Sequence, residues 1–256
     1  MSNPRIRDWQ GRRVWILGAS GGIGAALARE LAGRGARVAV SARRGEALAA
    51  LAGELPGALP WPCDAADPGS VRVAAAAIAA AWGGIDLAIY NAGVWHPSRA
   101  DRLEAAAIDA TVDINLRAPM HFAAAVLPHL APGGSLAFVG SVSAYRALPR
   151  AALYGASKAG LAYFAAALHL ELAPRGIGVF LISPGFVDTP MTQVNRFAMP
   201  GLMSAAAAAR AIAAGFARGA FEIHFPRRLS WPLRWMRLLP DAAYFPLVRR
   251  LLGVPP

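Results

Sequence analysis

The sequence predicts an α/β fold in which helices cover both faces of a doubly wound, mostly parallel sheet. Short apolar runs rich in Val, Ile and Leu alternate with alanine-rich helical stretches, and the first run leads directly into a glycine-rich segment. The chain has 256 residues, of which 56% are hydrophobic, so it can bury one large core. We expect a single domain over residues 1–225 and an apolar, basic extension over residues 226–256.

The predicted strands are short and apolar throughout, which is typical of parallel strands buried on both faces. They cover residues 13–17, 36–41, 86–90, 135–140 and 177–183, with a weaker strand at 59–63, which Pro60 and Pro62 interrupt, and a short one at 221–225. The helices expected between them cover residues 23–33, 46–55, 70–82, 103–130 (one or two helices), 154–172 and 204–218. Sheets of this kind bind ligands beyond the carboxyl ends of their strands.

Residues 184–201 are predicted to form a loop, and we expect a substrate lid over about residues 186–218. The apolar side chains of this region fit an apolar substrate such as a long-chain aldehyde, a ketone or a lipid intermediate. They could equally pack the lid onto the core. They are Met191, Phe197, Met199, Leu202 and Met203, with Trp95 and Phe186 expected to flank the cleft.

Composition excludes several classes of protein. The single cysteine, Cys63, rules out an internal disulfide, and no metal site is expected. Residues 1–8 are polar, unlike a secretory signal, and no uninterrupted apolar stretch reaches the roughly 18 residues of a membrane span, so we expect a cytoplasmic protein. The formal charge is +11, but the sequence carries no nucleic-acid-binding motif, so no nucleic-acid partner is expected.

The first strand runs into Gly18-Ala19-Ser20-Gly21-Gly22-Ile23-Gly24 and then into a helical pattern. Glycines here let backbone N–H groups at a helix N-terminus approach a pyrophosphate with no Cβ in the way. A tight strand-to-helix turn would also explain them. With a strand before and a helix after, the segment is typical of a Rossmann-like dinucleotide site.

The second strand ends at Arg43 and Arg44. This position lies beside the adenosine ribose in dinucleotide folds, where a carboxylate accepts from a free 2′-OH and an arginine binds a 2′-phosphate. The arginines therefore favour NADP(H) over NAD(H). The alternative is that they solvate the start of a helix.

Tyr154 and Lys158 lie four residues apart at the start of a helical run, which places them on one face. Lys158 is the one lysine among 26 basic residues, so an ammonium group is specifically needed there. A neighbouring cation is expected to lower the pKa of the phenol toward a useful acid–base range. Ser141, just past a predicted strand, could hold a substrate oxygen near the phenol, and Ser143 is a rival for this role.

Taken together, these motifs resemble the short-chain dehydrogenase/reductase family over about residues 12–189. The resemblance implies that Asn115, Ser141, Tyr154 and Lys158 form a catalytic tetrad, and that the protein is a homodimer or homotetramer. One departure is Leu17, where the family often has Thr. The resemblance and the motifs together give these cofactor-binding residues: Gly18, Ser20, Gly22, Ile23, Gly24, Arg43, Arg44, Asp64, Asn91, Ala92, Gly93, Tyr154, Lys158, Pro184, Gly185 and Thr189.

The sequence therefore predicts an NADP(H)-dependent oxidoreductase that interconverts a carbonyl and an alcohol on a small molecule. The alternatives are a non-catalytic NADP-binding regulator and a membrane-surface scaffold. The second arises because residues 226–256 mix aromatic and aliphatic side chains with six arginines, against Asp241 as the one acid. Such a segment fits an anchor on an anionic membrane, a subunit interface or a cover over the cleft.

Overall fold

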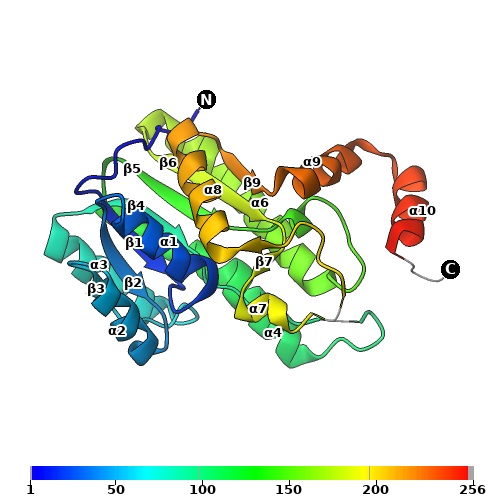
Figure 1. Ribbon diagram of the computed structural model, residues 1–256, viewed down its shortest axis with the longest axis horizontal. Coiled ribbons are helices and arrows are strands. Elements are labelled where there is room, and N and C mark those ends of the chain that lie inside the picture. The colour runs from blue at the N-terminus through cyan, green and yellow to red at the C-terminus, as the bar shows by residue number, and fades with distance from the viewer. Residues whose placement is uncertain (1, 98, 196, 253–256) are drawn as a thin grey trace.

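A parallel sheet with helices on both faces organises the chain (Figure 1). The computed structural model describes residues 2–97, 99–195 and 197–252, so residues 1, 98 and 196 of the predicted domain and 253–256 of the predicted extension lie outside it. Within these ranges the sheet has seven strands in the order β3-β2-β1-β4-β5-β6-β9, and every neighbouring pair is parallel. The predicted doubly wound α/β fold is confirmed.

The strands of this sheet are separated by helices along the chain. The strands are β1 (Arg13–Leu17), β2 (Arg37–Ser41), β3 (Leu59–Pro60), β4 (Ile85–Tyr90), β5 (Leu130–Val139), β6 (Gly178–Pro184) and β9 (Glu222–Phe225). The helices between them are α1 (Gly22–Ala32), α2 (Gly45–Glu54), α3 (Pro68–Trp82), α4 (Ala105–Val112), α5 (Ala118–Val126), α6 (Ala152–Leu172) and α8 (Ala205–Arg218).

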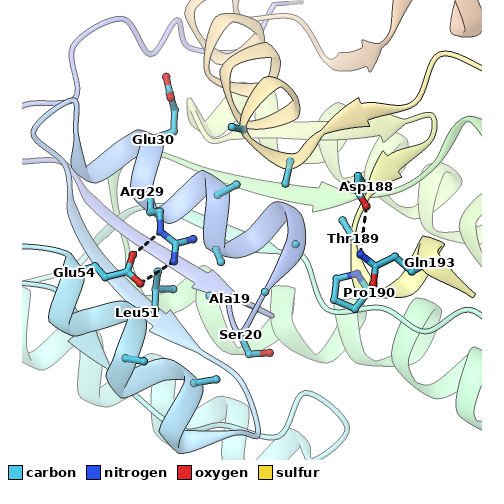
Figure 2. A pocket seen from close by; sticks show the side chains of 18 residues that line it. Ala19, Ser20, Arg29, Glu30, Leu51, Glu54, Asp188, Thr189, Pro190 and Gln193 are labelled. Atoms are coloured by element: carbon cyan, nitrogen blue, oxygen red, sulfur yellow. Dashed lines mark hydrogen bonds and ion pairs between the residues drawn. The ribbon is translucent and has the colours of Figure 1, made fainter.

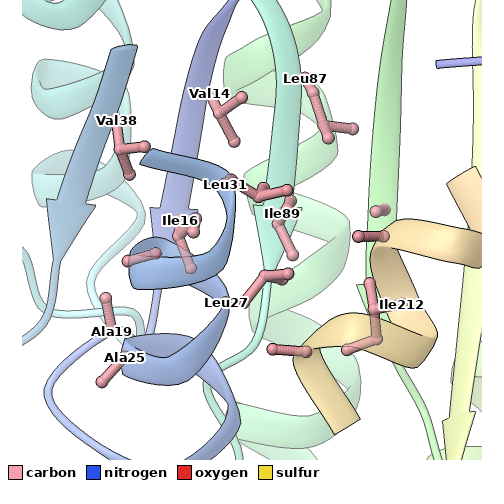
Figure 3. Packing of buried hydrophobic residues seen from close by; sticks show 14 of the residues in the cluster. Val14, Ile16, Ala19, Ala25, Leu27, Leu31, Val38, Leu87, Ile89 and Ile212 are labelled. Atoms are coloured by element: carbon pink, nitrogen blue, oxygen red, sulfur yellow. The ribbon is translucent and has the colours of Figure 1, made fainter. Parts of the chain in front are cut away.

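Two apolar clusters fill the spaces between the sheet and its helices. On β1, Val14 and Ile16 belong to the cluster that packs against α1 and α8, whereas Trp15 and Leu17 belong to the cluster on the other face. Figure 3 shows the first cluster, in which Leu27 of α1 and Ile212 of α8 pack over the sheet. Because successive side chains of a strand point to opposite faces, burial of both faces explains the uninterrupted apolar runs.

Three predicted elements differ in extent from the observed ones. The weak strand at 59–63 is reduced to the two residues of β3, because Pro60 and Pro62 have no N–H to donate. Strand β5 begins at Leu130 rather than 135, and its register shifts against β4 between Ile85 and Leu87. The predicted helix over 103–130 is divided into α4, a π-helical segment (Asp113–Arg117) and α5.

The segment predicted as a lid, residues 186–218, contains two different parts: short elements over residues 186–204 and the helix α8 (Ala205–Arg218). The first part holds β7 (Val187–Asp188), α7 (Pro190–Gln193) and β8 (Met203–Ser204), and β7 pairs with β8 in a small parallel sheet. Helix α8 instead belongs to the core layer, because Ala209, Ile212 and Phe216 are buried in the cluster that α1 shares.

The C-terminal extension forms α9 (Arg227–Trp235), a 3-10 turn (Met236–Leu238) and α10 (Asp241–Leu252). In Figure 1 these elements leave the sheet at its β9 edge, on the side opposite α2 and α3. Arg146 attaches them to the domain by donating to the carbonyl of Met236 at 3.1 Å and by pairing with Asp241. Among the described helices, none is both long and apolar enough to cross a membrane.

Candidate active site

A cleft of about 710 Å³ opens at the carboxyl ends of the parallel strands. The polypeptide reverses its winding between β1 and β4, which are adjacent in the sheet, so the loops after these strands separate and leave space for a ligand. The segments after β2, β5 and β6 complete the walls. The predicted site residues that line the cleft are Gly18, Ser20, Gly22, Ile23, Arg43, Arg44, Asp64, Asn91, Ala92, Gly93, Ser141, Tyr154, Lys158, Pro184, Gly185 and Thr189.

Two predicted site residues, Gly24 and Asn115, do not line the cleft but support the segments that do. A Cβ on Gly24 would lie 2.3 Å from the carbonyl oxygen of Gly18, so the first turn of α1 needs glycine to pack against the end of β1. Gly18 itself has φ +94°, and a Cβ there would lie 2.4 Å from the Ala92 nitrogen. The glycine-rich loop thus combines a left-handed backbone with close approach to the loop after β4.

Asn115 holds the loop after β4 in place. It lies in the π-helical segment and is fully buried. Its side-chain amide makes two hydrogen bonds with the backbone of Val94, as a neighbouring strand would. Nδ2 donates to the Val94 carbonyl at 3.0 Å, and Oδ1 accepts from the Val94 N–H at 2.9 Å. Nδ2 also lies 3.2 Å from Oγ of Ser157, on α6. The side chain therefore links the loop after β4 to the helix that carries Tyr154 and Lys158.

Lys158 extends along the floor of the cleft and is only 2% exposed. Its ammonium donates to the main-chain carbonyl of Val139, at the end of β5, at 2.8 Å. The Nζ atom lies 5.7 Å from the centroid of the Tyr154 ring. Burial lowers the pKa of Lys158 to about 8, because the charged form loses hydration that one hydrogen bond to a carbonyl does not replace.

Tyr154 shares this face of α6, but its pKa does not follow the expectation from sequence. Burial raises the pKa of the phenol to about 12, and a hydrogen bond with Ser141 opposes that shift only in part. The expected lowering by Lys158 is wrong for this state of the site, because the ammonium is directed to Val139. The phenol is therefore protonated at neutral pH.

The two candidate serines differ in their surroundings. Ser141 lines the cleft, and its Oγ accepts the N–H of Ser143 at 3.1 Å. The hydroxyl of Ser143 is buried with no hydrogen-bond partner among the described residues. Of the two, Ser141 is the one that lines the cleft.

The apolar residues predicted around the cleft divide into two groups. Met191 lines it directly. Trp95 packs edge-on against Tyr154, with ring centroids 5.1 Å apart, and Phe186 contacts Phe197, but neither Trp95 nor Phe186 is among the residues that line the cleft. The cleft is also lined by residues that were not among the predicted site residues. Most of them lie at or just after strand ends or between residues 187 and 192, whereas Ala110 and Ile114 come from α4 and the π-helical segment. The others are Leu17, Gly21, Ala42, Cys63, Ala65, Val94, Val139, Gly140, Val187, Pro190 and Thr192.

A second hollow of about 740 Å³ lies on the outer side of the glycine-rich loop, between α1, α2 and the start of α8. Figure 2 shows the Arg29–Glu54 ion pair on one side of it and Thr189 and Pro190 on the other. It shares Ser20, Gly21, Gly22, Thr189 and Pro190 with the first cleft but includes none of Ser141, Tyr154 and Lys158. The candidate chemistry therefore belongs to the first cleft.

This arrangement defines a class of protein. A parallel doubly wound sheet, a glycine-rich loop opening a helix at its switch point, and a tyrosine–lysine pair at the strand ends are typical of dinucleotide-dependent oxidoreductases. A family model described as short chain dehydrogenase matches residues 12–199. The chain belongs to the short-chain dehydrogenase/reductase family of oxidoreductases.

Three similar proteins illustrate the range of the family. An uncharacterised oxidoreductase of Myxococcus xanthus is 35% identical over 246 residues, which cover 94% of this chain and 97% of that protein. A short-chain dehydrogenase from Burkholderia cenocepacia, solved in complex with NADP, is 33% identical with a TM-score of 0.76, covering 86% of this chain and 98% of that one. A 3-ketoacyl-(acyl-carrier-protein) reductase from Brucella melitensis, solved with NADH, is 27% identical with a TM-score of 0.78, covering 86% and 100%.

Proposed function

We propose that the protein is an NADP(H)-dependent oxidoreductase that interconverts a carbonyl and an alcohol by hydride transfer on an apolar or lipid-like small molecule. The observation that carries this proposal is the convergence of Ser141, Tyr154 and Lys158 on one cleft at the carboxyl edge of the sheet. A hydroxyl that can hold an oxygen, a phenol that can give it a proton and a buried cation are the groups that carbonyl reduction requires.

The state of these side chains favours a proton donor. A phenol whose pKa is raised to about 12 carries its proton at neutral pH, so Tyr154 can protonate the oxygen of a carbonyl undergoing reduction. Ser141 would orient that oxygen by a hydrogen bond. Lys158 would stabilise the phenolate left after the proton moves, and Asn115 positions the loop and helix that carry the site. When bound, the nicotinamide supplies or accepts the hydride.

The residues around the cleft fit a dinucleotide. A Cβ at Gly18 or Gly24 would collide with neighbouring backbone, so this loop requires glycine at both positions. The loop leads into the N-terminus of α1, where free backbone N–H groups attract phosphate. Arg43 and Arg44 are exposed at the end of β2, and Arg44 lies 3.3 Å from Oγ of Ser20. Two guanidinium groups beside this loop support our preference for NADP(H) over NAD(H).

The preference for an apolar substrate rests on Met191 in the cleft wall and on Trp95 against the Tyr154 ring. We further propose a homodimer or homotetramer in the cytoplasm.

A substrate screen tests the proposal. Purified protein is incubated with NADPH, or with NADH in parallel, and a panel of aldehydes and ketones of increasing chain length, while absorbance of the reduced cofactor is followed. We expect turnover that rises with chain length and is faster with NADPH.

The Tyr154→Phe variant is the matched control. It should bind NADPH as the wild type does but lose roughly a hundredfold to ten-thousandfold in turnover, because the proton donor is removed. Near wild-type turnover in this variant would refute the assignment of Tyr154. NADPH binding without turnover on any substrate would instead favour a regulator.

A further inference from the structure

Helix α9 displays an apolar and basic stripe to solvent. Trp231 and Trp235 of α9 and Leu238 of the 3-10 turn that follows it are spaced at intervals of four and three residues, which places them on one side of this helical segment. Their exposed fractions are 45%, 64% and 74%. Arg227, four residues before Trp231, continues the same side, and Arg228 flanks it; both are exposed. We call these five residues the tail face.

Neighbouring residues of α9 hold the tail face in position, and Trp231 itself packs edge-on against His224 of β9, with ring centroids 5.4 Å apart. Ser230 is fully buried, and its hydroxyl lies 2.7 Å from Nδ1 of His224 on β9. Arg234 pairs with the largely buried carboxylate of Glu222 at 2.9 Å. Large exposed tryptophans on a docked helix are therefore a property of the folded protein, and an unfolded or detached end is not needed to explain them.

Helix α10 shows the same division. Tyr244 and Val248, four residues apart, are buried, and the hydroxyl of Tyr244 donates to the carbonyl of Ala147 at 2.6 Å. Phe245 and Leu252 are at least half exposed, and exposed arginines lie near the helix end. Both helices of the extension thus combine buried anchoring residues with exposed large apolar and basic residues.

The charge of the extension selects an anionic partner. Residues 227–252 contain six arginines and one acid, Asp241, and that acid is already paired with Arg146 of the domain. Basic groups beside tryptophan, phenylalanine and leucine match the boundary between lipid headgroups and acyl chains, where the apolar groups insert and the cations meet anionic headgroups. An acidic soluble protein would satisfy the arginines but would leave the exposed tryptophans without an apolar environment.

We propose that the tail face docks on the surface of a bilayer containing anionic lipid, with α9 lying in the interface. Helix α9 begins beside the cleft. A Cβ on Gly185, which lines the cleft, would lie 2.7 Å from Leu229 of α9, and Trp231 follows two residues later. If the oxidoreductase function proposed above holds, docking sets the cleft close to lipid and the substrate is a carbonyl compound or alcohol that partitions into the membrane.

Vesicle sedimentation tests the docking independently of catalysis. The full-length protein is mixed with phosphatidylcholine vesicles or with vesicles that also contain phosphatidylglycerol. We expect binding to the anionic vesicles, weakened by salt, and little binding to the zwitterionic ones. The Trp231→Gln/Trp235→Gln variant should bind roughly tenfold or more weakly. The Arg227→Gln/Arg228→Gln variant should lose roughly fivefold for each arginine at low salt.

Matched controls alter equally exposed side chains elsewhere. Val73→Gln/Leu103→Gln replaces exposed apolar residues near α3 and α4, and Arg72→Gln/Arg210→Gln removes exposed arginines of α3 and α8. Both should bind vesicles as the wild type does, and all variants should retain the wild-type melting temperature and NADPH affinity. Equal binding to both vesicle types, no binding, or equal losses in the controls would each overturn the proposal. A change of oligomeric state in the tryptophan variant without any vesicle binding would also overturn it, in favour of a subunit interface.

Discussion

At the scale of single residues, the candidate site contains a buried lysine, Lys158, whose charged form is destabilised by burial. Lys158 is almost fully buried, and the Val139 carbonyl is the partner that its ammonium contacts directly. Its pKa of about 8 lies below the ordinary value of 10.5, so the charged form is destabilised in the folded protein. Natural proteins accept such local costs at functional sites, where chemistry rather than stability selects the residue.

A Lys158→Met variant should therefore be more stable than the wild type at pH 7, by about 2 kcal/mol, while losing turnover. A folded-state pKa below the unfolded one means that the wild type releases a proton on folding between pH 8 and pH 10.5, so its stability rises with pH across that window. The difference in stability between the Lys158→Met variant and the wild type should therefore become smaller as the pH rises from 8 to 10.5. Urea unfolding of both proteins at pH 7 and near pH 10 measures this. A variant that is less stable at pH 7, or a gap that stays constant, would contradict it.

Arg43 and Arg44 carry the second residue-scale prediction. If they bind a 2′-phosphate, Arg43→Ala/Arg44→Ala should raise KM for NADPH roughly tenfold to a hundredfold and leave KM for NADH nearly unchanged, since charge-assisted hydrogen bonds are lost only with the phosphorylated cofactor. The control is Arg37→Ala, at the amino end of the same strand β2. Steady-state kinetics with both cofactors give the result. A parallel rise in both KM values would assign the arginines to helix solvation or to the shared pyrophosphate.

At the scale of elements, β9 connects the extension to the two segments that form the reacting end of the cleft. One carboxylate oxygen of Glu222 accepts from the hydroxyls of Tyr145 and Ser183, each at 2.7 Å, and the other accepts from Arg234. Tyr145 follows Ser141 by four residues, and Ser183 directly precedes Pro184 in the cleft wall. Burial and the charge of Glu222 raise the pKa of Tyr145, so its hydroxyl remains a donor.

Glu222→Gln should lower the free energy of unfolding by about 1–3 kcal/mol, because Arg234 loses its partner in a largely buried place. It should also lower kcat, since the segments of Ser141 and Pro184 lose a shared anchor, with little change in KM for NADPH. The control is Glu30→Gln, which breaks a more exposed ion pair with Arg34 and should cost less than about 1 kcal/mol. Equal losses in the two variants, or an unchanged kcat in Glu222→Gln, would refute the anchoring role.

Elements also show where prediction from sequence succeeds and where it fails. Strands β1, β2, β4 and β6 were predicted closely because burial on both faces leaves a continuous apolar run. The start of β5 was missed because Pro132, Gly133 and Gly134 are typical of a turn. The strand is in fact irregular there, since Leu130 pairs with Ile85 and Ser135 with Leu87, and Gly133 between them has φ +72°. The π-helical segment at Asn115 has no local signal, since it depends on hydrogen bonds to Val94 and Ser157, which are remote in sequence.

At the scale of the whole molecule, the sequence predicted the position of the candidate site but not the pKa of its tyrosine. Spacing alone places Tyr154 and Lys158 on one face of a helix, and the parallel topology brings Ser141 to them. The direction of the ammonium depends on the end of β5, which lies across the sheet edge and leaves no trace in the spacing. The excess of arginine in the extension is also visible in the sequence. The sequence does not show which side chains of the extension are exposed, because that depends on how the extension packs against Arg146 and Glu222.

The choice of arginine at 25 of the 26 basic positions has a practical consequence for labelling. Lys158 is the only side-chain amine of the chain, and it lies on the floor of the cleft. Reagents that acylate or reductively alkylate primary amines thus have a single side-chain target. The N-terminal amine reacts as well, so the extent of modification at Lys158 is read by mass spectrometry of the peptide that contains it. That extent reports on access to the cleft and on anything that occupies it.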